Sequence, residues 1–160
     1  MTKSIAGICH SRQIESEHVE VLCGAPAPNA PRTIPAVVFT DPEIAWAGLT
    51  ETRAEQAGQP YKVASYPWAA SGRAHSLGRP DGLTKWLVDP ETDRLLGCGI
   101  SGPGAGELIA EAVVAIDNRC TVADIAQSVH PHPTLSETLS NAADAYLGTA
   151  IEIYKPRRGK

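Results

Sequence analysis

Two apolar segments joined by a four-residue turn constrain the fold of this chain more than any other feature of its sequence. Residues 82–90 (GLTKWLVDP) and 94–102 (RLLGCGISG) flank the turn Pro90–Asp93 (PETD), which consists of residues that favour a reversal of the chain. This pattern predicts a β-hairpin, in which the two strands pair antiparallel. The hairpin therefore places this part of the chain in an antiparallel sheet.

Two further strand signals precede the hairpin. IPAVVF (34–39) is β-branched and apolar, as a buried strand is, and YKVASYP (61–67) alternates in the manner of a strand. The segment between them begins with TDPEIAWAGLTE (40–51), which is expected to turn the chain.

Most of the helix signals follow the hairpin. A short helix is expected at 50–58, before it, with a glycine at its end. Residues 104–120 carry apolar side chains at helical spacing, and further helices are expected at 121–129, with Thr121 as the N-cap, and at 136–146. Strands in a run followed by helices predict an α+β fold, an antiparallel β-sheet with helices layered on one face.

The composition limits the classes of function. A chain of 160 residues with 42% hydrophobic and 20% charged residues is long and apolar enough to form one folded domain. Its net charge of −4 gives no basic footprint for nucleic acid or a membrane surface, and neither is expected as a partner. The cysteines form no CxxC pair, which favours reduced thiols and a cytoplasmic protein; they are Cys9, Cys23, Cys98 and Cys120.

The chain is expected to divide into three parts. Residues 1–33 form an N-terminal segment whose end, CGAPAPNAPRT (23–33), has the three prolines and the glycine of a linker. Residues 34–154 form the folded domain. Residues 155–160 form a basic tail, for which a solvated end is the simplest interpretation.

A glycine motif in the second strand of the hairpin invites a dinucleotide interpretation. Gly97, Gly99 and Gly102 match the pattern GxGxxG between a strand and a helix. A dinucleotide site needs that strand to begin a parallel βαβ unit, whereas this strand belongs to a hairpin and the following helix leads to more helix. We expect instead that these glycines let a helix pack close to the sheet, and that the chain binds no cofactor through a phosphate loop of its own.

The stretch HPHPTLSE (130–137) is the main candidate for chemistry. His130 and His132 each precede a proline, which places them in a rigid loop, and Glu137 lies near the start of the next helix. A carboxylate that holds one ring nitrogen of a histidine makes the other nitrogen a better general base. The residues alone favour the simpler alternative, two loop histidines beside a helix-start acid. A metal site has less support, because no third ligand has a recognisable spacing.

Five segments, in order and with the spacing of one family, resemble the C-terminal dimerisation domain of the FAD-dependent pyridine nucleotide–disulfide oxidoreductases. Within that family the resemblance is strongest to the dihydrolipoamide dehydrogenases. The segments are IPAVVFTDPEIAWAGLTE (34–51), YPWAASGRA (66–74), GLTKWLVDPETDRLLG (82–97), GAGELIAEAVVAID (104–117) and HPHPTLSE (130–137).

The resemblance implies a homodimeric flavoenzyme with separate FAD and NAD domains, which serves 2-oxo acid dehydrogenase complexes. His132 would reach across the dimer interface and deprotonate a dihydrolipoamide thiol, and Glu137 would orient its imidazole and stabilise the charged form. Electrons would pass from a redox disulfide to FAD and then to NAD. The resemblance also implies a cis peptide between His132 and Pro133, and only a supporting role for His130.

Two departures from the family pattern matter. Pro131 stands where relatives usually carry a small residue, and nothing in the chain resembles the nucleotide-binding domains or the C-x4-C redox pair. FAD and NAD are therefore not expected to bind this chain alone, and the isolated chain is expected to be inactive. Two alternatives stay open: a stand-alone dimerisation module without activity, and the equivalent domain of another disulfide reductase, such as glutathione or mercuric reductase.

A domain built to bury one face against its twin and another against missing domains is expected to expose apolar surface. The tryptophans Trp46, Trp68 and Trp86 are expected to pack in the core or in an interface, because such side chains bury a large apolar area.

Overall fold

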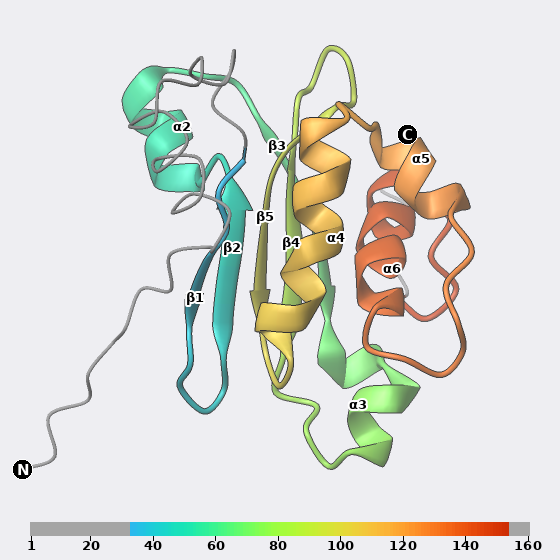
Figure 1. Ribbon diagram of the computed structural model, residues 1–160. Coiled ribbons are helices and arrows are strands. Elements are labelled where there is room, and N and C mark those ends of the chain that lie inside the picture. The colour runs from blue at the N-terminus through green and yellow to red at the C-terminus, as the bar shows by residue number, and fades with distance from the viewer. Residues whose placement is uncertain (1–32, 154–160) are drawn as a thin grey trace, which may run out of the picture.

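Five strands form one sheet in the order β1-β2-β5-β4-β3, and all neighbouring strands are antiparallel (Figure 1). The computed structural model describes residues 33–153, so the expectations for the N-terminal segment and the basic tail lie outside the described residues, apart from Thr33. The strands are β1 (Ala36–Val38), β2 (Ile44–Gly48), β3 (Lys62–Pro67), β4 (Leu83–Val88) and β5 (Leu95–Ser101).

Three helices lie on one side of this sheet (Figure 1); two of them contact its strands, and the third packs against one of these two. They are α4 (Ala105–Asp117), α5 (Val122–Gln127) and α6 (Glu137–Leu147). The connections between strands carry α2 (Glu51–Ala57), the short 3-10 helix η1 (Trp68–Ala70) and α3 (Gly72–Ser76). The expected α+β architecture, with an antiparallel sheet and helices on one face, is confirmed.

The predicted hairpin forms from β4 and β5, and its turn has a clear local cause. The carboxylate of Asp89 accepts hydrogen bonds from the backbone N–H of Glu91, at 2.9 Å, and of Thr92, at 3.3 Å. These donors, with that of Glu91 foremost, lower the pKa of Asp89. The turn closes with Asp93 in a left-handed conformation, at φ 53°, which aspartate tolerates better than most residues.

Residues 40–51 were expected to turn the chain, and they do, but the strand that follows the turn was not predicted. The chain turns before Ile44, and residues 44–48 then form β2, which pairs with β1 on one side and with β5 on the other. Ala45 and Ala47 are the buried residues of this strand, and their small side chains give a weak strand signal. Because β2 takes an inner position, β1 lies at the edge of the sheet and is half-buried rather than buried.

The core lies between the sheet and the three helices. Trp68 and Trp86 are fully buried, and each indole N–H has an acceptor: the Thr84 hydroxyl at 2.9 Å and the Leu139 carbonyl at 3.0 Å, respectively. Trp46 is half-buried. The expected packing in the core thus holds for Trp68 and Trp86. Their hydrogen bonds connect η1 to β4 and β4 to α6.

The glycine motif serves close packing, but not in the way that was expected. A Cβ on Gly97 would lie 1.9 Å from the backbone oxygen of Leu49, and one on Gly102 would lie 2.3 Å from the ring of Trp68. A Cβ on Gly99 would meet no atom within 4 Å. The close neighbours are therefore a backbone segment and a tryptophan ring, not a helix packed on the sheet.

Large apolar side chains remain exposed on this domain, as the sequence led us to expect. Phe39, Val114 and Val129 have 68%, 62% and 98% of their surface exposed. Within residues 33–153, no helix has both the length and the apolar character that crossing a membrane requires.

Candidate functional site

The loop between α5 and α6 carries both histidines of the predicted site. Helix α5 has Thr121 as its N-cap, as expected, and the cap is reciprocal. The Thr121 hydroxyl accepts from the N–H of Asp124, and the Asp124 carboxylate accepts from the N–H of Thr121 at 2.7 Å. The backbone donor of Thr121 lowers the pKa of Asp124. The helix ends at Gln127, two residues earlier than expected, and frees the chain to form the loop.

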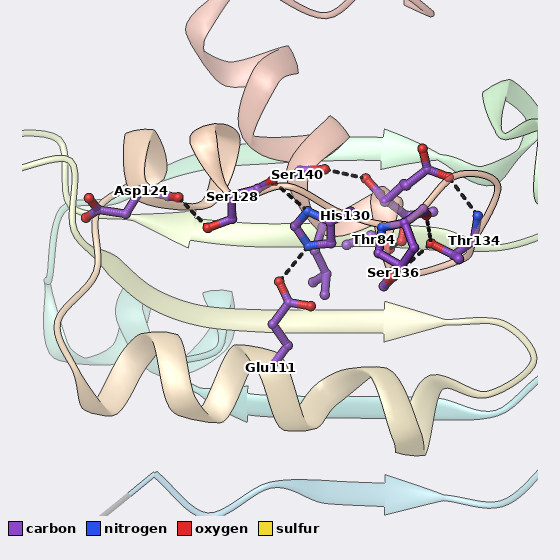
Figure 2. Close-up of polar contacts among 12 residues, drawn as sticks. Thr84, Glu111, Asp124, Ser128, His130, Thr134, Ser136 and Ser140 are labelled. Carbon is purple, nitrogen blue, oxygen red and sulfur yellow. Dashed lines mark hydrogen bonds and ion pairs between the residues drawn. The ribbon is translucent and has the colours of Figure 1, made fainter.

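Hydrogen bonds of Thr134 define the bend of the loop. Its hydroxyl lies 2.7 Å from the carbonyl oxygen of Pro131 and 2.8 Å from the hydroxyl of Ser136 (Figure 2). Because a carbonyl can only accept, Thr134 donates to Pro131 and Ser136 donates to Thr134. The peptide bond between His132 and Pro133 is cis, as the family resemblance implied.

The structure brings His132 and Glu137 together. Nδ1 of His132 lies 2.8 Å from Oε1 of Glu137, and the other carboxylate oxygen accepts the backbone N–H of Thr134 at 2.7 Å. An ionised carboxylate only accepts, so Nδ1 of His132 carries a proton. Nε2 has no hydrogen-bond partner within residues 33–153, and 75% of the histidine side chain is exposed. This arrangement leaves a basic nitrogen facing outward, which suits proton transfer to or from a group outside the domain.

His130 lies in a different environment, although it is only two residues away. Its Nδ1 lies 2.9 Å from the carbonyl oxygen of Ser128, and its Nε2 lies 2.8 Å from Oε1 of Glu111 in α4 (Figure 2). Only 8% of the side chain is exposed. Sequence reasoning missed Glu111, which lies 19 residues before His130 along the chain. The sequence did offer one signal: Glu111 lies next to the apolar stripe of α4, and a carboxylate that is partly buried there needs a hydrogen-bond partner.

No metal or dinucleotide site is evident in the described part of the chain. Residues 33–153 contain no group of three or more His, Cys, Asp or Glu residues placed to hold a metal. The glycine motif is filled by Leu49 and Trp68, so it does not fit the phosphates of FAD or NAD. Cys98 is buried, and this burial raises the pKa of its thiol, which makes it a poor nucleophile.

Comparison with known proteins places the chain in a family. The family model described as "Pyridine nucleotide-disulphide oxidoreductase, dimerisation domain" matches residues 34–143. This match covers more than half of the 160 residues, and the observed fold agrees with it. The chain therefore belongs to the pyridine nucleotide–disulphide oxidoreductases, as a dimerisation domain of that family.

Similar proteins of high identity within this family are dihydrolipoyl dehydrogenases. The enzyme of Thermus scotoductus is 52% identical over 120 residues, which cover 75% of this chain and 26% of the relative. The enzyme of Vibrio cholerae is 43% identical over 134 residues, which cover 84% of this chain and 28% of the relative. The chain thus spans little more than a quarter of the length of these relatives.

Two solved structures show the same fold. LpdA of Mycobacterium tuberculosis superposes with a TM-score of 0.72 at 30% identity, over 81% of this chain and 28% of that protein. The HOCl-induced flavoprotein disulfide reductase RclA of Escherichia coli superposes with a TM-score of 0.72 at 25% identity, over 81% of this chain and 30% of that protein. The resemblance predicted from the sequence is confirmed.

Proposed function

We propose that this chain is the interface domain of a dihydrolipoamide dehydrogenase-like flavoenzyme, in which residues 34–154 form the domain and His132 and Glu137 supply the acid–base pair. One observation carries the proposal: Nδ1 of His132 is held at 2.8 Å by Glu137, while the exposed side chain leaves Nε2 free of partners within residues 33–153.

In the proposed mechanism, Nε2 of His132 accepts the proton of a dihydrolipoamide thiol. A thiol with an ordinary pKa of about 8.5 is mostly protonated near neutral pH, and only its thiolate attacks a disulfide. The carboxylate of Glu137 stabilises the imidazolium that forms and keeps the ring in one orientation. The backbone N–H of Thr134 in turn holds Glu137, so the pair is arranged before substrate arrives.

The other half of the reaction is proposed to lie outside these residues. Cys98 is buried, and the described residues do not fit FAD or NAD, so the disulfide, the flavin and the nucleotide would belong to other domains. Three further features follow from the family resemblance: a homodimer in which His132 faces the partner subunit, association with 2-oxo acid dehydrogenase complexes, and a cytoplasmic location.

Two alternatives have support of their own. The first is a stand-alone dimerisation module without activity, because the family model that matches residues 34–143 describes a dimerisation domain. The similarity to RclA supports the equivalent domain of another disulfide reductase. Sedimentation equilibrium and a flavin absorbance scan of the purified chain address the first alternative. We expect a colourless protein that produces no NADH from dihydrolipoamide and NAD.

The central experiment places this domain in a complete enzyme. The matching region of the Thermus scotoductus relative is replaced by residues 34–154, and NAD reduction by dihydrolipoamide is measured. We expect His132→Gln to lower kcat/KM by about 10²–10⁴-fold, the usual contribution of general acid–base catalysis. His75→Gln is the matched control, because His75 is also exposed but lies on α3.

The two variants separate the possible roles of the pair. An active chimera in which His132→Gln has no more effect than His75→Gln would refute the acid–base role. Activity with dihydrolipoamide that depends on His132 would rule out a purely structural module.

A further inference from the structure

Both ring nitrogens of His130 lie within hydrogen-bond distance of oxygen atoms. The Ser128 carbonyl, 2.9 Å from Nδ1, can only accept a hydrogen bond. An ionised Glu111, 2.8 Å from Nε2, also only accepts. With Glu111 ionised, both contacts are hydrogen bonds only when His130 carries a proton on each nitrogen, as the imidazolium.

His132 has the opposite arrangement. Glu137 holds its Nδ1 proton, and its Nε2 faces outward without a partner within residues 33–153. His130 is nearly buried at 8% exposure, whereas His132 is 75% exposed. The two histidines, separated only by Pro131, thus lie in different environments. Both ring nitrogens of His130 are held as in a cation, whereas Nε2 of His132 can accept a proton.

His130 connects the loop to a second helix. Glu137 holds the loop at its α6 end, where its carboxylate contacts His132 and accepts the backbone N–H of Thr134. Glu111 and His130 hold the opposite end against α4 (Figure 2). Proline between the histidines restricts the backbone, so a displacement of His130 is transmitted to His132 rather than absorbed.

We propose that the ion pair of Glu111 and His130 is a positioning device for His132. The Glu111 carboxylate holds His130 as the imidazolium, and this contact sets the place of the histidine two residues later. The assignment of a reaction to His132 rests on the proposed function, but the ion pair itself and its test do not.

The charged and titratable groups around His130 are consistent with a stable cation. Glu111 faces it from α4, and the same carboxylate acts on Cys98 of β5, whose thiol stays neutral because burial raises its pKa. The loop itself contributes the uncharged carbonyl of Ser128. No positive group contacts the His130 ring within residues 33–153, so nothing there opposes its charge.

The test uses the 160-residue chain labelled with ¹⁵N in its histidine rings, and follows the ring nitrogens by NMR near neutral pH. Both nitrogens of His130 should be protonated, whereas His132 should carry a proton on Nδ1 only. In Glu111→Gln, the amide group can donate to Nε2, so His130 can keep both contacts as a neutral ring with its proton on Nδ1.

Two substitutions at Glu111 separate positioning from mere proximity. Glu111→Ala removes the contact, and the ¹⁵N signals of His132 should shift as its hydrogen bond to Glu137 loosens. Glu111→Gln keeps the contact without the charge, so His130 should become neutral while the His132 signals stay close to those of the wild type. The conservative variant therefore rescues the position of His132, an effect that general loss of stability would not produce.

Three results would overturn the proposal: an unprotonated nitrogen on His130 in the wild type, unchanged His132 signals in Glu111→Ala, or equal shifts in both variants. If Glu111→Ala does not fold, the isosteric Glu111→Gln still tests the imidazolium. Because no cofactor or substrate is present, these results do not depend on activity. A failure of the positioning role is therefore distinct from a failure of the proposed function, which the chimera tests.

Discussion

The side-chain hydroxyl of Thr84 in β4 lies 2.8 Å from that of Thr138 in α6, and both residues are fully buried. The indole of Trp68 donates to Thr84 at 2.9 Å, and Thr138 donates to the carbonyl of Leu135 at 2.7 Å. Since an indole only donates and a carbonyl only accepts, the hydroxyl protons must all point from Trp68 toward Leu135. The chain of bonds attaches the first turn of α6, which begins with Glu137, to the sheet.

Breaking this series of hydrogen bonds at Thr84 should destabilise the domain. Thr84→Val removes the acceptor of the Trp68 indole and the donor to Thr138, and each buried group left without a partner costs about 1–3 kcal/mol. Urea denaturation measures the free energy of unfolding. Thr84→Ser keeps the hydroxyl and is the matched control, with a smaller expected loss. A loss in Thr84→Ser with none in Thr84→Val would show that the methyl group, and not the hydrogen bond, stabilises the site.

The glycines of β5 provide a test of why the GxGxxG pattern exists here. A Cβ on Gly97 would overlap the backbone oxygen of Leu49, so Gly97→Ala should lower the free energy of unfolding by about 1–3 kcal/mol or more. Gly99 has open space, so Gly99→Ala should be neutral or stabilise the domain by up to about 1 kcal/mol. Thermal or urea unfolding of both variants measures this. A destabilised Gly99→Ala with an unaffected Gly97→Ala would contradict the packing explanation.

Much of the fold was predictable because its main signals are local. The turn from Pro90 to Asp93 and the helix spacing after Gly104 can be recognised within a few residues. The strand from Ile44 to Gly48 was not recognised, because its core-facing residues are alanines and its neighbours include a proline. Its inner position is decided by pairing with β5, a contact about fifty residues away in the chain.

The site shows the same division between local and long-range information. His132 and Glu137 are five residues apart, and a loop followed by a helix start brings them together, so their contact was predictable. The partner of His130 was not, because Glu111 approaches from another helix once both have packed on the sheet. Bonds such as that between Thr84 and Thr138 depend in the same way on tertiary packing.

Alkaline pH should weaken the contact between Tyr146 and Asp93. The Tyr146 hydroxyl donates to the carboxylate at 2.7 Å, and burial, followed by this bond, raises its pKa from 10.0 to about 12. The hydrogen bond thus contributes fully to the free energy of unfolding below pH 10.0, where the tyrosine of the unfolded chain is also neutral. This contribution is lost as the pH rises toward about 12. Tyr146→Phe should reduce the fall in unfolding free energy over this range. An identical pH dependence in the two proteins would contradict this assignment.

His132 and Glu137 should act as a unit in the chimeric enzyme. Glu137→Gln removes the charge that stabilises the imidazolium, but the amide oxygen can still accept a hydrogen bond from Nδ1 of His132. The kcat/KM of this variant should therefore fall by a smaller factor than that of His132→Gln, for which a fall of about 10²–10⁴-fold is expected. When two groups serve one proton transfer, removing the second after the first has little further effect. The double variant should therefore resemble His132→Gln alone. Losses that multiply in the double variant would mean that Glu137 contributes independently of His132, and the orienting role proposed for its carboxylate would then be wrong.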